Sequence, residues 1–209
     1  MGFSGTFITT RADRPLTSLP ALRPSAAKAS WHWQGPDGWQ VVQVDRGPAG
    51  WDSPDLPVAW DGLVRGLVEQ AGHPVLAAVI KDSDGAQLLG RSPQAGRWGG
   101  WLKPDRITWS SLPDDGPRPY WDENGSQHSE DGATWERRHQ EALDRLYAQA
   151  GPPRSAAAPQ AIAWAREAGL TPDPAATAAA MDADSAFAED ALFQLLAALG
   201  IPSLPAWDL

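Results

Sequence analysis

The chain has 209 residues, 12 tryptophans, no cysteine and a net charge of −9. The absence of cysteine excludes disulfides, thiolate metal sites and thiol catalysis, and it favours a reducing compartment. The acidic balance disfavours direct binding to nucleic acid, because a duplex-binding surface needs clustered Lys and Arg, and here the lysines number only three.

The length suits one large domain or two small ones, and it lets a hydrophobic core bury roughly 70% of the unfolded surface. No apolar run approaches the roughly 20 residues that a membrane span requires. The first residues lack the charged start and apolar stretch of a signal peptide. We therefore expect a cytoplasmic protein that does not bind membranes. The richness in Ala, Pro, Gly and Arg indicates a bacterial genome of high GC content.

Two strands are expected near the N-terminus. Residues 2–11 carry three apolar side chains among three threonines, which indicates a first strand. Prolines interrupt residues 16–29, so we expect that segment to be irregular. The turn sequence Gly35-Pro36-Asp37-Gly38 then leads into a second strand at residues 39–44.

The clearest element is a helix at residues 55–71. Its apolar side chains recur at three- and four-residue steps and form one helical face: Trp60, Leu63, Val64, Leu67, Val68 and Ala71. Asp55 can cap the first turn, which also accepts Pro57. Gly72 follows the last apolar position, and Pro74 prevents the helix from continuing.

A hairpin is expected directly after this helix. Residues 74–80 are apolar throughout and too short for a second such helix, which is typical of an interior strand. Residues 82–85 supply turn chemistry, with Gly85 able to take a positive φ. Residues 86–89 return as the second strand, which we expect Gly90 and Pro93 to end.

Regular pattern is weak between residues 93 and 132. We expect one short strand at residues 106–109 and irregular structure elsewhere, because prolines recur. The glycine-rich stretch at residues 96–100 lacks the Lys-Ser/Thr of a phosphate-binding loop, so we interpret it as a tight turn beside packed tryptophan. The many aromatic side chains argue against disorder.

The C-terminal third is helical by its apolar periodicity. An amphipathic helix runs from about residue 134 to a cap at Gly151, and further helices are expected at residues 161–168, 171–181 and 182–199. The sequence therefore predicts an α+β fold. An antiparallel sheet with one main helix occupies residues 1–125, and a helical portion, residues 133–209, packs on it.

Two segments approach the pattern of a metal site and depart from it at decisive positions. Residues 122–131 alternate oxygen-bearing side chains as calcium loops do, but Gln127 and Ala133 replace the glycine and the final glutamate. Glu136 and His139 have the spacing of a di-iron ligand pair, but there is no second such pair. We interpret residues 122–131 as a solvated acidic loop, with a weak surface cation site as the alternative. We interpret His139 as a half-buried helical histidine. We predict no cofactor and no metal.

The tryptophan content has two interpretations. A large core could use most of the rings, because each one buries roughly 200 Å². Trp, Tyr and Arg also dominate binding hot spots. Arginines interleave with aromatic residues along 91–121, which gives the candidate binding residues Arg91, Arg97, Trp98, Trp101, Arg106, Trp109, Arg118, Tyr120 and Trp121.

The acidic charge, the lack of catalytic motifs and this Trp- and Arg-rich segment favour recognition over catalysis. The segment Gly2-Phe3-Ser4-Gly5, for example, has the wrong spacing for a nucleophile elbow. Our hypothesis is a binding or regulatory protein that recognises another protein, and an immunity or inhibitor protein is one form of it.

Two other classes stay open. The first is an enzyme or a small-molecule-binding protein with a pocket between the two portions, lined by Asp82, Asp84, Asp105, Asp114, Asp115 and Asp122. The second is an acidic mimic of nucleic acid, which needs carboxylates at phosphate-like spacing on one face. The spread of negative charge along the whole chain argues against this mimic.

Overall fold

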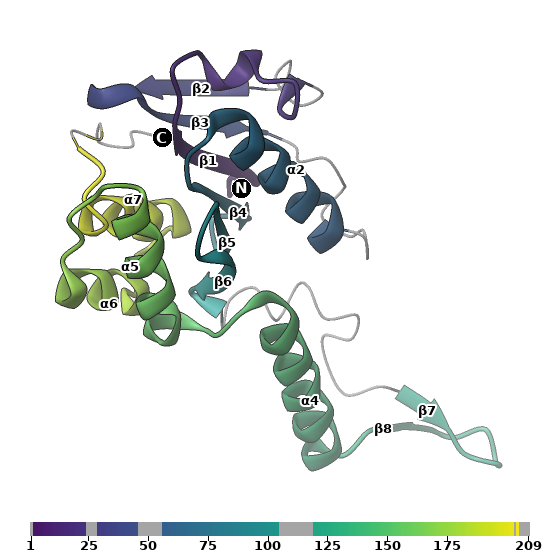
Figure 1. The fold of residues 1–209 in the computed structure, drawn as a ribbon. Coiled ribbons are helices and arrows are strands. Elements are labelled where there is room, and N and C mark those ends of the chain that lie inside the picture. The colour runs from purple at the N-terminus through teal and green to yellow at the C-terminus, as the bar shows by residue number, and fades with distance from the viewer. Residues whose placement is uncertain (1, 24–28, 46–55, 105–118, 203, 205–209) are drawn as a thin grey trace.

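The computed structural model describes residues 2–23, 29–45, 56–104, 119–202 and 204. Six strands form one antiparallel sheet in the order β2-β3-β1-β4-β5-β6 (Figure 1). Their bounds are β1 (Gly5–Arg11), β2 (Ala29–Gln34), β3 (Trp39–Val44), β4 (Val75–Lys81), β5 (Gly85–Ser92) and β6 (Gly96–Leu102). A separate pair of short strands comprises β7 (Pro119–Trp121) and β8 (Gln127–Ser129).

Five α-helices accompany the strands within the described residues: α2 (Leu56–Ala71), α4 (Gly132–Ala150), α5 (Ala158–Glu167), α6 (Pro174–Asp182) and α7 (Ala188–Ala198). Short 3₁₀ turns occur at η1 (Leu16–Ser18), η2 (Pro36–Gly38) and η3 (Arg154–Ala157). The protein thus has the predicted α+β fold. No helix in the described part of the chain is long and apolar enough to span a membrane.

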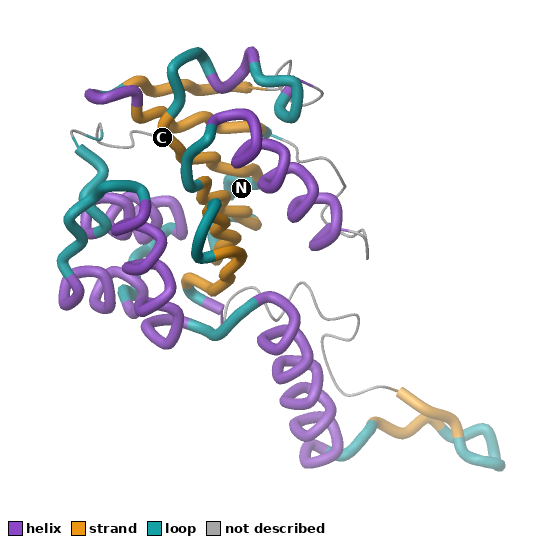
Figure 2. The backbone as a smooth tube through the Cα atoms, viewed as in Figure 1, coloured by secondary structure: helices purple, strands orange, loops and turns teal. Residues whose placement is uncertain are grey.

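Helices cover both faces of the six-stranded sheet (Figure 2). Val75, Ala77 and Val79 of β4 belong to a core shared with α2 and η1 on one face. The alternate residues Leu76, Ala78 and Ile80 belong to the core formed with α5, α6 and α7. Because successive side chains of a strand point to opposite faces, a strand covered on both sides is apolar at every position.

The β4–β5 turn connects the helical layer to the sheet. Asp82 and Ser83 take left-handed backbone angles (φ 50° and 58°), whereas the sequence assigned this role to Gly85. The Ser83 carbonyl accepts a hydrogen bond of 2.8 Å from the Ala188 N–H at the start of α7. The Ser83 hydroxyl donates one of 2.7 Å to the buried Glu189 carboxylate. These bonds stabilise a turn conformation that costs a non-glycine residue about 1–2 kcal/mol.

Most predicted elements are present near their expected positions. The strands expected at 2–11, 39–44, 74–80 and 86–89 correspond to β1, β3, β4 and β5, and the helices correspond to α2 and α4–α7. The capping residue Asp55 and the strand expected at 106–109 lie outside the described residues. The division into portions 1–125 and 133–209 stays a prediction.

The turn predicted at residues 96–100 and the strand end predicted at Gly90 were wrong, although β5 does end before Pro93 and the neighbouring tryptophans are packed as expected. β5 continues to Ser92, and the glycine-rich stretch is strand β6 instead of a turn. The glycines serve close packing: a Cβ on Gly90 would lie 1.9 Å from Nε1 of Trp98, and one on Gly100 would lie 2.6 Å from the Cβ of Ala157. Glycine inside a strand often marks such a close approach, which a pattern of apolar side chains cannot reveal.

Candidate functional site: the projecting arm

Helix α4 and the β7–β8 hairpin form an arm (residues 119–150) that extends away from the sheet and the other helices (Figure 1). Asp131 caps the start of α4 by accepting a hydrogen bond of 3.0 Å from the Thr134 N–H. The hydrogen bonds with Thr134 lower the pKa of Asp131. A negative charge at a helix N-terminus also interacts favourably with the helix dipole.

The other end of α4 rests on the edge of the sheet. Gly151 ends the helix with φ 108° and ψ 165°. A Cβ there would lie 2.2 Å from the carbonyl carbon and oxygen of Gly99, so only glycine allows this contact. Two residues later, Pro153 forms an isolated parallel bridge with Trp101. The base of the arm is therefore held against β6.

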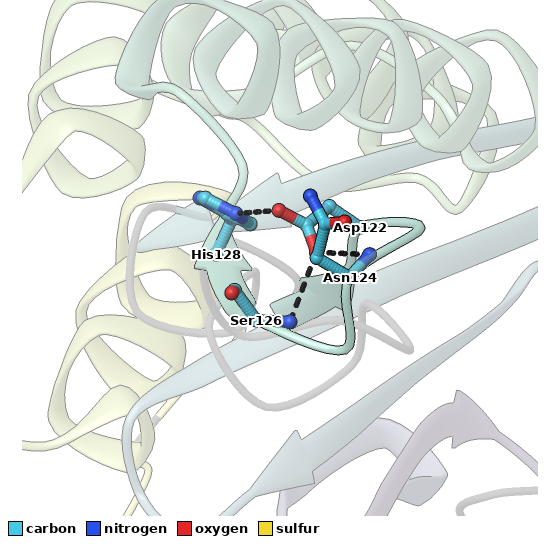
Figure 3. A network of polar contacts seen from close by, with 4 residues as sticks. All are labelled: Asp122, Asn124, Ser126 and His128. Carbon is cyan, nitrogen blue, oxygen red and sulfur yellow. Dashed lines mark hydrogen bonds and ion pairs between the residues drawn. The ribbon is translucent and has the colours of Figure 1, made fainter.

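One carboxylate organises the turn of the hairpin (Figure 3). Oδ1 of Asp122 accepts hydrogen bonds of 2.9 Å from the N–H groups of Asn124 and Ser126. Oδ2 lies 2.9 Å from Nε2 of His128. The bond with the His128 side chain, followed by the backbone bonds, holds the pKa of Asp122 below its ordinary value of 3.8. Asp122 is therefore ionised at neutral pH and serves the turn.

The hairpin has two different faces. Tyr120 pairs with His128 across the strands, and the two rings stack at 5.4 Å with 24° between their planes. Trp121 pairs with Gln127 and, by the alternation of strand side chains, lies on the opposite face. Tyr120 is 54% exposed and Trp121 is 63% exposed. All six residues of β7 and β8 are exposed.

The structure separates the residues that the sequence proposed as one binding segment. Trp98 and Trp101 are only 7% and 4% exposed and belong to the interior. Arg91 and Arg97 meet at Asp61 of α2, with nitrogen-to-Oδ1 distances of 3.2 and 3.5 Å. Tyr120 and Trp121 lie on the arm, and three candidates fall outside the described residues: Arg106, Trp109 and Arg118.

The aspartates suggested for a pocket are also apart where the structure describes them. Asp82 and Asp84 lie at the β4–β5 turn of the sheet, whereas Asp122 lies on the hairpin, beyond the far end of α4 (Figure 1). The other three, Asp105, Asp114 and Asp115, lie outside the described residues. Within the described part of the chain, no three His, Asp or Glu side chains group together in a way that could hold a metal ion.

The described surface includes two polar hollows. The larger, about 420 Å³, lies where β1 and β2 end and β3 begins, and is lined by Arg11, Asp13, Arg14 and Asp37 among others. The smaller, about 250 Å³, lies at the base of the arm between Trp98, Ala148 and Gln160. Gln40, beside the larger hollow, uses its amide to bind the Leu16 N–H and two carbonyls, so it holds the backbone in place.

The β7–β8 hairpin was not predicted, although the sequence contains a signal for it. Asn124-Gly125 is a strong hairpin dipeptide, and Gly125 takes the positive φ of 77° that such turns require. The short flanking strands lack the apolar alternation that would have made the signal convincing.

Comparison with known proteins gave no functional information. No protein-family model, no curated protein sequence and no solved structure matches the chain. The functional conclusion therefore depends on the exposed side chains of the chain itself.

Proposed function

We propose that this protein is an intracellular, cytoplasmic recognition protein that binds another protein through the β7–β8 hairpin, with Trp121 as the anchoring side chain. The exposure of Trp121 is the observation that carries the proposal. Every other tryptophan in the described residues is buried or half-buried, whereas the Trp121 indole is 63% exposed. Burial of such a ring against a partner removes roughly 200 Å² of surface from water.

The construction of the hairpin also supports the proposal. An isolated two-stranded hairpin is at best marginally stable in water. This one has no apolar face packed on the described core, and its turn depends on the hydrogen bonds of Asp122. A structure that exposes tryptophan and contributes little to the core is better explained as a contact element than as a support for the fold.

Partner capture with matched variants tests the proposal. Tagged wild-type protein is expressed in its native cell, cross-linked and purified, and the captured proteins are identified. Trp121→Ala should weaken capture of the specific partner by roughly 30-fold, which corresponds to the loss of about 2 kcal/mol expected for a hot-spot residue. Trp121→Ala should fold normally, because surface substitutions usually change stability by less than about 0.5 kcal/mol.

Phe187→Ala is the control, since Phe187 is also an exposed aromatic residue (45%) but lies at the start of α7. It should leave capture unchanged. Equal capture by the wild-type and Trp121→Ala proteins would refute the proposal. If the partner is an enzyme or a toxin, adding the purified protein should reduce its activity, which is the immunity or inhibitor form of this function.

A further inference from the structure

We infer that the partner presents a basic segment, in which a lysine or arginine side chain stacks on the Trp121 indole while neighbouring cations pair with the carboxylates of the hairpin. This inference rests on the proposed function of the hairpin. It goes further by fixing the chemistry of the partner.

The charged side chains of the hairpin sequence are acidic, apart from His128, which pairs with Asp122. Residues 119–131 contain Asp122, Glu123, Glu130 and Asp131, and they contain neither lysine nor arginine. Glu130 is paired with Arg138 of α4 at 2.6 Å. Asp122 and Asp131 accept hydrogen bonds that favour their ionised forms, and Glu123 is exposed in the turn. The hairpin that carries the indole therefore attracts cations.

Tryptophan is the best aromatic residue for binding a cation over its ring. The Tyr120 ring is already stacked on His128, whereas Trp121 lies on the opposite face beside the neutral side chain of Gln127. A cationic side chain can therefore reach the indole without displacing the Tyr120–His128 stack. The carboxylates can then attract other cations on the same segment, because the Debye length at physiological salt is roughly 8 Å.

The same charges argue against other occupants. A purely apolar partner would desolvate ionised carboxylates without compensation, which is costly. An acidic partner, a nucleic acid or an anionic membrane would be repelled. A second copy of the chain, with its net charge of −9, would bring two acidic hairpins together. A basic protein segment satisfies both the ring and the carboxylates.

Binding of defined peptides to the full-length protein tests the inference. The probe is a fluorescein-labelled octapeptide of alternating Arg and Lys, and its comparison is an octapeptide of alternating Glu and Asp. Affinity is measured by fluorescence anisotropy at 50 and 150 mM salt. The basic peptide should bind, and its affinity should fall as the salt concentration rises. Its binding should also shift the Trp121 indole N–H resonance in NMR spectra. The acidic peptide should not bind.

Paired variants separate the hairpin from non-specific attraction to an acidic protein. Trp121→Ala should lower the affinity for the basic peptide about 10-fold, and Glu123→Gln should lower it two- to three-fold. Phe187→Ala and Asp184→Asn make the same kinds of change at exposed positions between α6 and α7 and should alter affinity less than two-fold.

Three results would overturn the inference: equal losses for Asp184→Asn and Glu123→Gln, equal binding of the acidic peptide, or self-association that Trp121→Ala abolishes in sedimentation experiments. If Trp121→Ala abolishes partner capture in cells but does not change basic-peptide binding, the proposed function stands and the basic partner is wrong. If Trp121→Ala weakens binding of the basic peptide but does not change capture of the partner in cells, the proposed function fails instead.

Discussion

Replacing Gly151 with alanine should loosen the arm from the sheet. Its backbone angles, φ 108° and ψ 165°, lie in a region that is essentially restricted to glycine and costs other residues about 1–3 kcal/mol. The new Cβ would also lie 2.2 Å from the Gly99 carbonyl and 2.7 Å from the Gly100 nitrogen, which are backbone atoms that cannot rotate away. Overpacking of this kind adds about 1–3 kcal/mol. We expect Gly151→Ala to lower the free energy of unfolding by about 3 kcal/mol, because a small movement of the backbone at residue 151 away from β6 relieves some of the clash.

Urea unfolding of Gly151→Ala and Gly169→Ala measures this effect against a matched control. Gly169 also has a positive φ (80°), but a Cβ there would meet nothing within 4 Å. Gly169→Ala should therefore lose only the free energy of unfolding that alanine costs in the left-handed conformation, about 1–2 kcal/mol. Hydrogen exchange of the β6 amides should accelerate in Gly151→Ala alone. If the two variants lose the same stability and β6 stays equally protected, the close contact at Gly151 does not hold the arm.

Two carboxylates give further tests. Burial alone would raise the pKa of Glu167, but hydrogen bonds from a hydroxyl and two N–H groups near the β5–β6 turn outweigh it and hold this pKa below its ordinary value of 4.5. Glu167→Gln should therefore lower the free energy of unfolding by about 1–2 kcal/mol at pH 7, and the difference from wild type should vanish as pH falls through the lowered pKa. The control Glu69→Gln, at an exposed position of α2, should change the free energy of unfolding at pH 7 by less than about 0.5 kcal/mol. Asp122 also has a lowered pKa, so NMR signals of the ordered hairpin should persist above pH 3.8 and disappear as pH falls through the folded pKa. Asp122→Asn should remove this pH dependence. A hairpin that is unchanged at pH 2 would contradict the role of the carboxylate in the turn.

Patterns of apolar side chains predicted the parts of the fold that depend on burial alone. The stripe of α2 and the continuous apolar run of β4 follow directly from which faces they cover. β6 was missed because its identity depends on small residues that make room for Trp98 and Ala157. Those neighbours come from elsewhere in the chain, and local periodicity contains no information about them.

The candidate site was harder to predict for a related reason. Trp98, Trp101 and Trp121 are chemically identical and lie in one segment of 24 residues, so composition gives them equal weight. What separates them is the set of elements that cover each ring: the interior encloses the first two, and the hairpin leaves the third in solvent. Only tertiary packing decides which tryptophan can meet a partner.

The bridge between Trp101 and Pro153 places the points where the chain departs from β6 and comes back to it about one strand spacing, roughly 5 Å, apart. The segment between these two points can therefore be replaced by another sequence without changing the path of the remaining backbone.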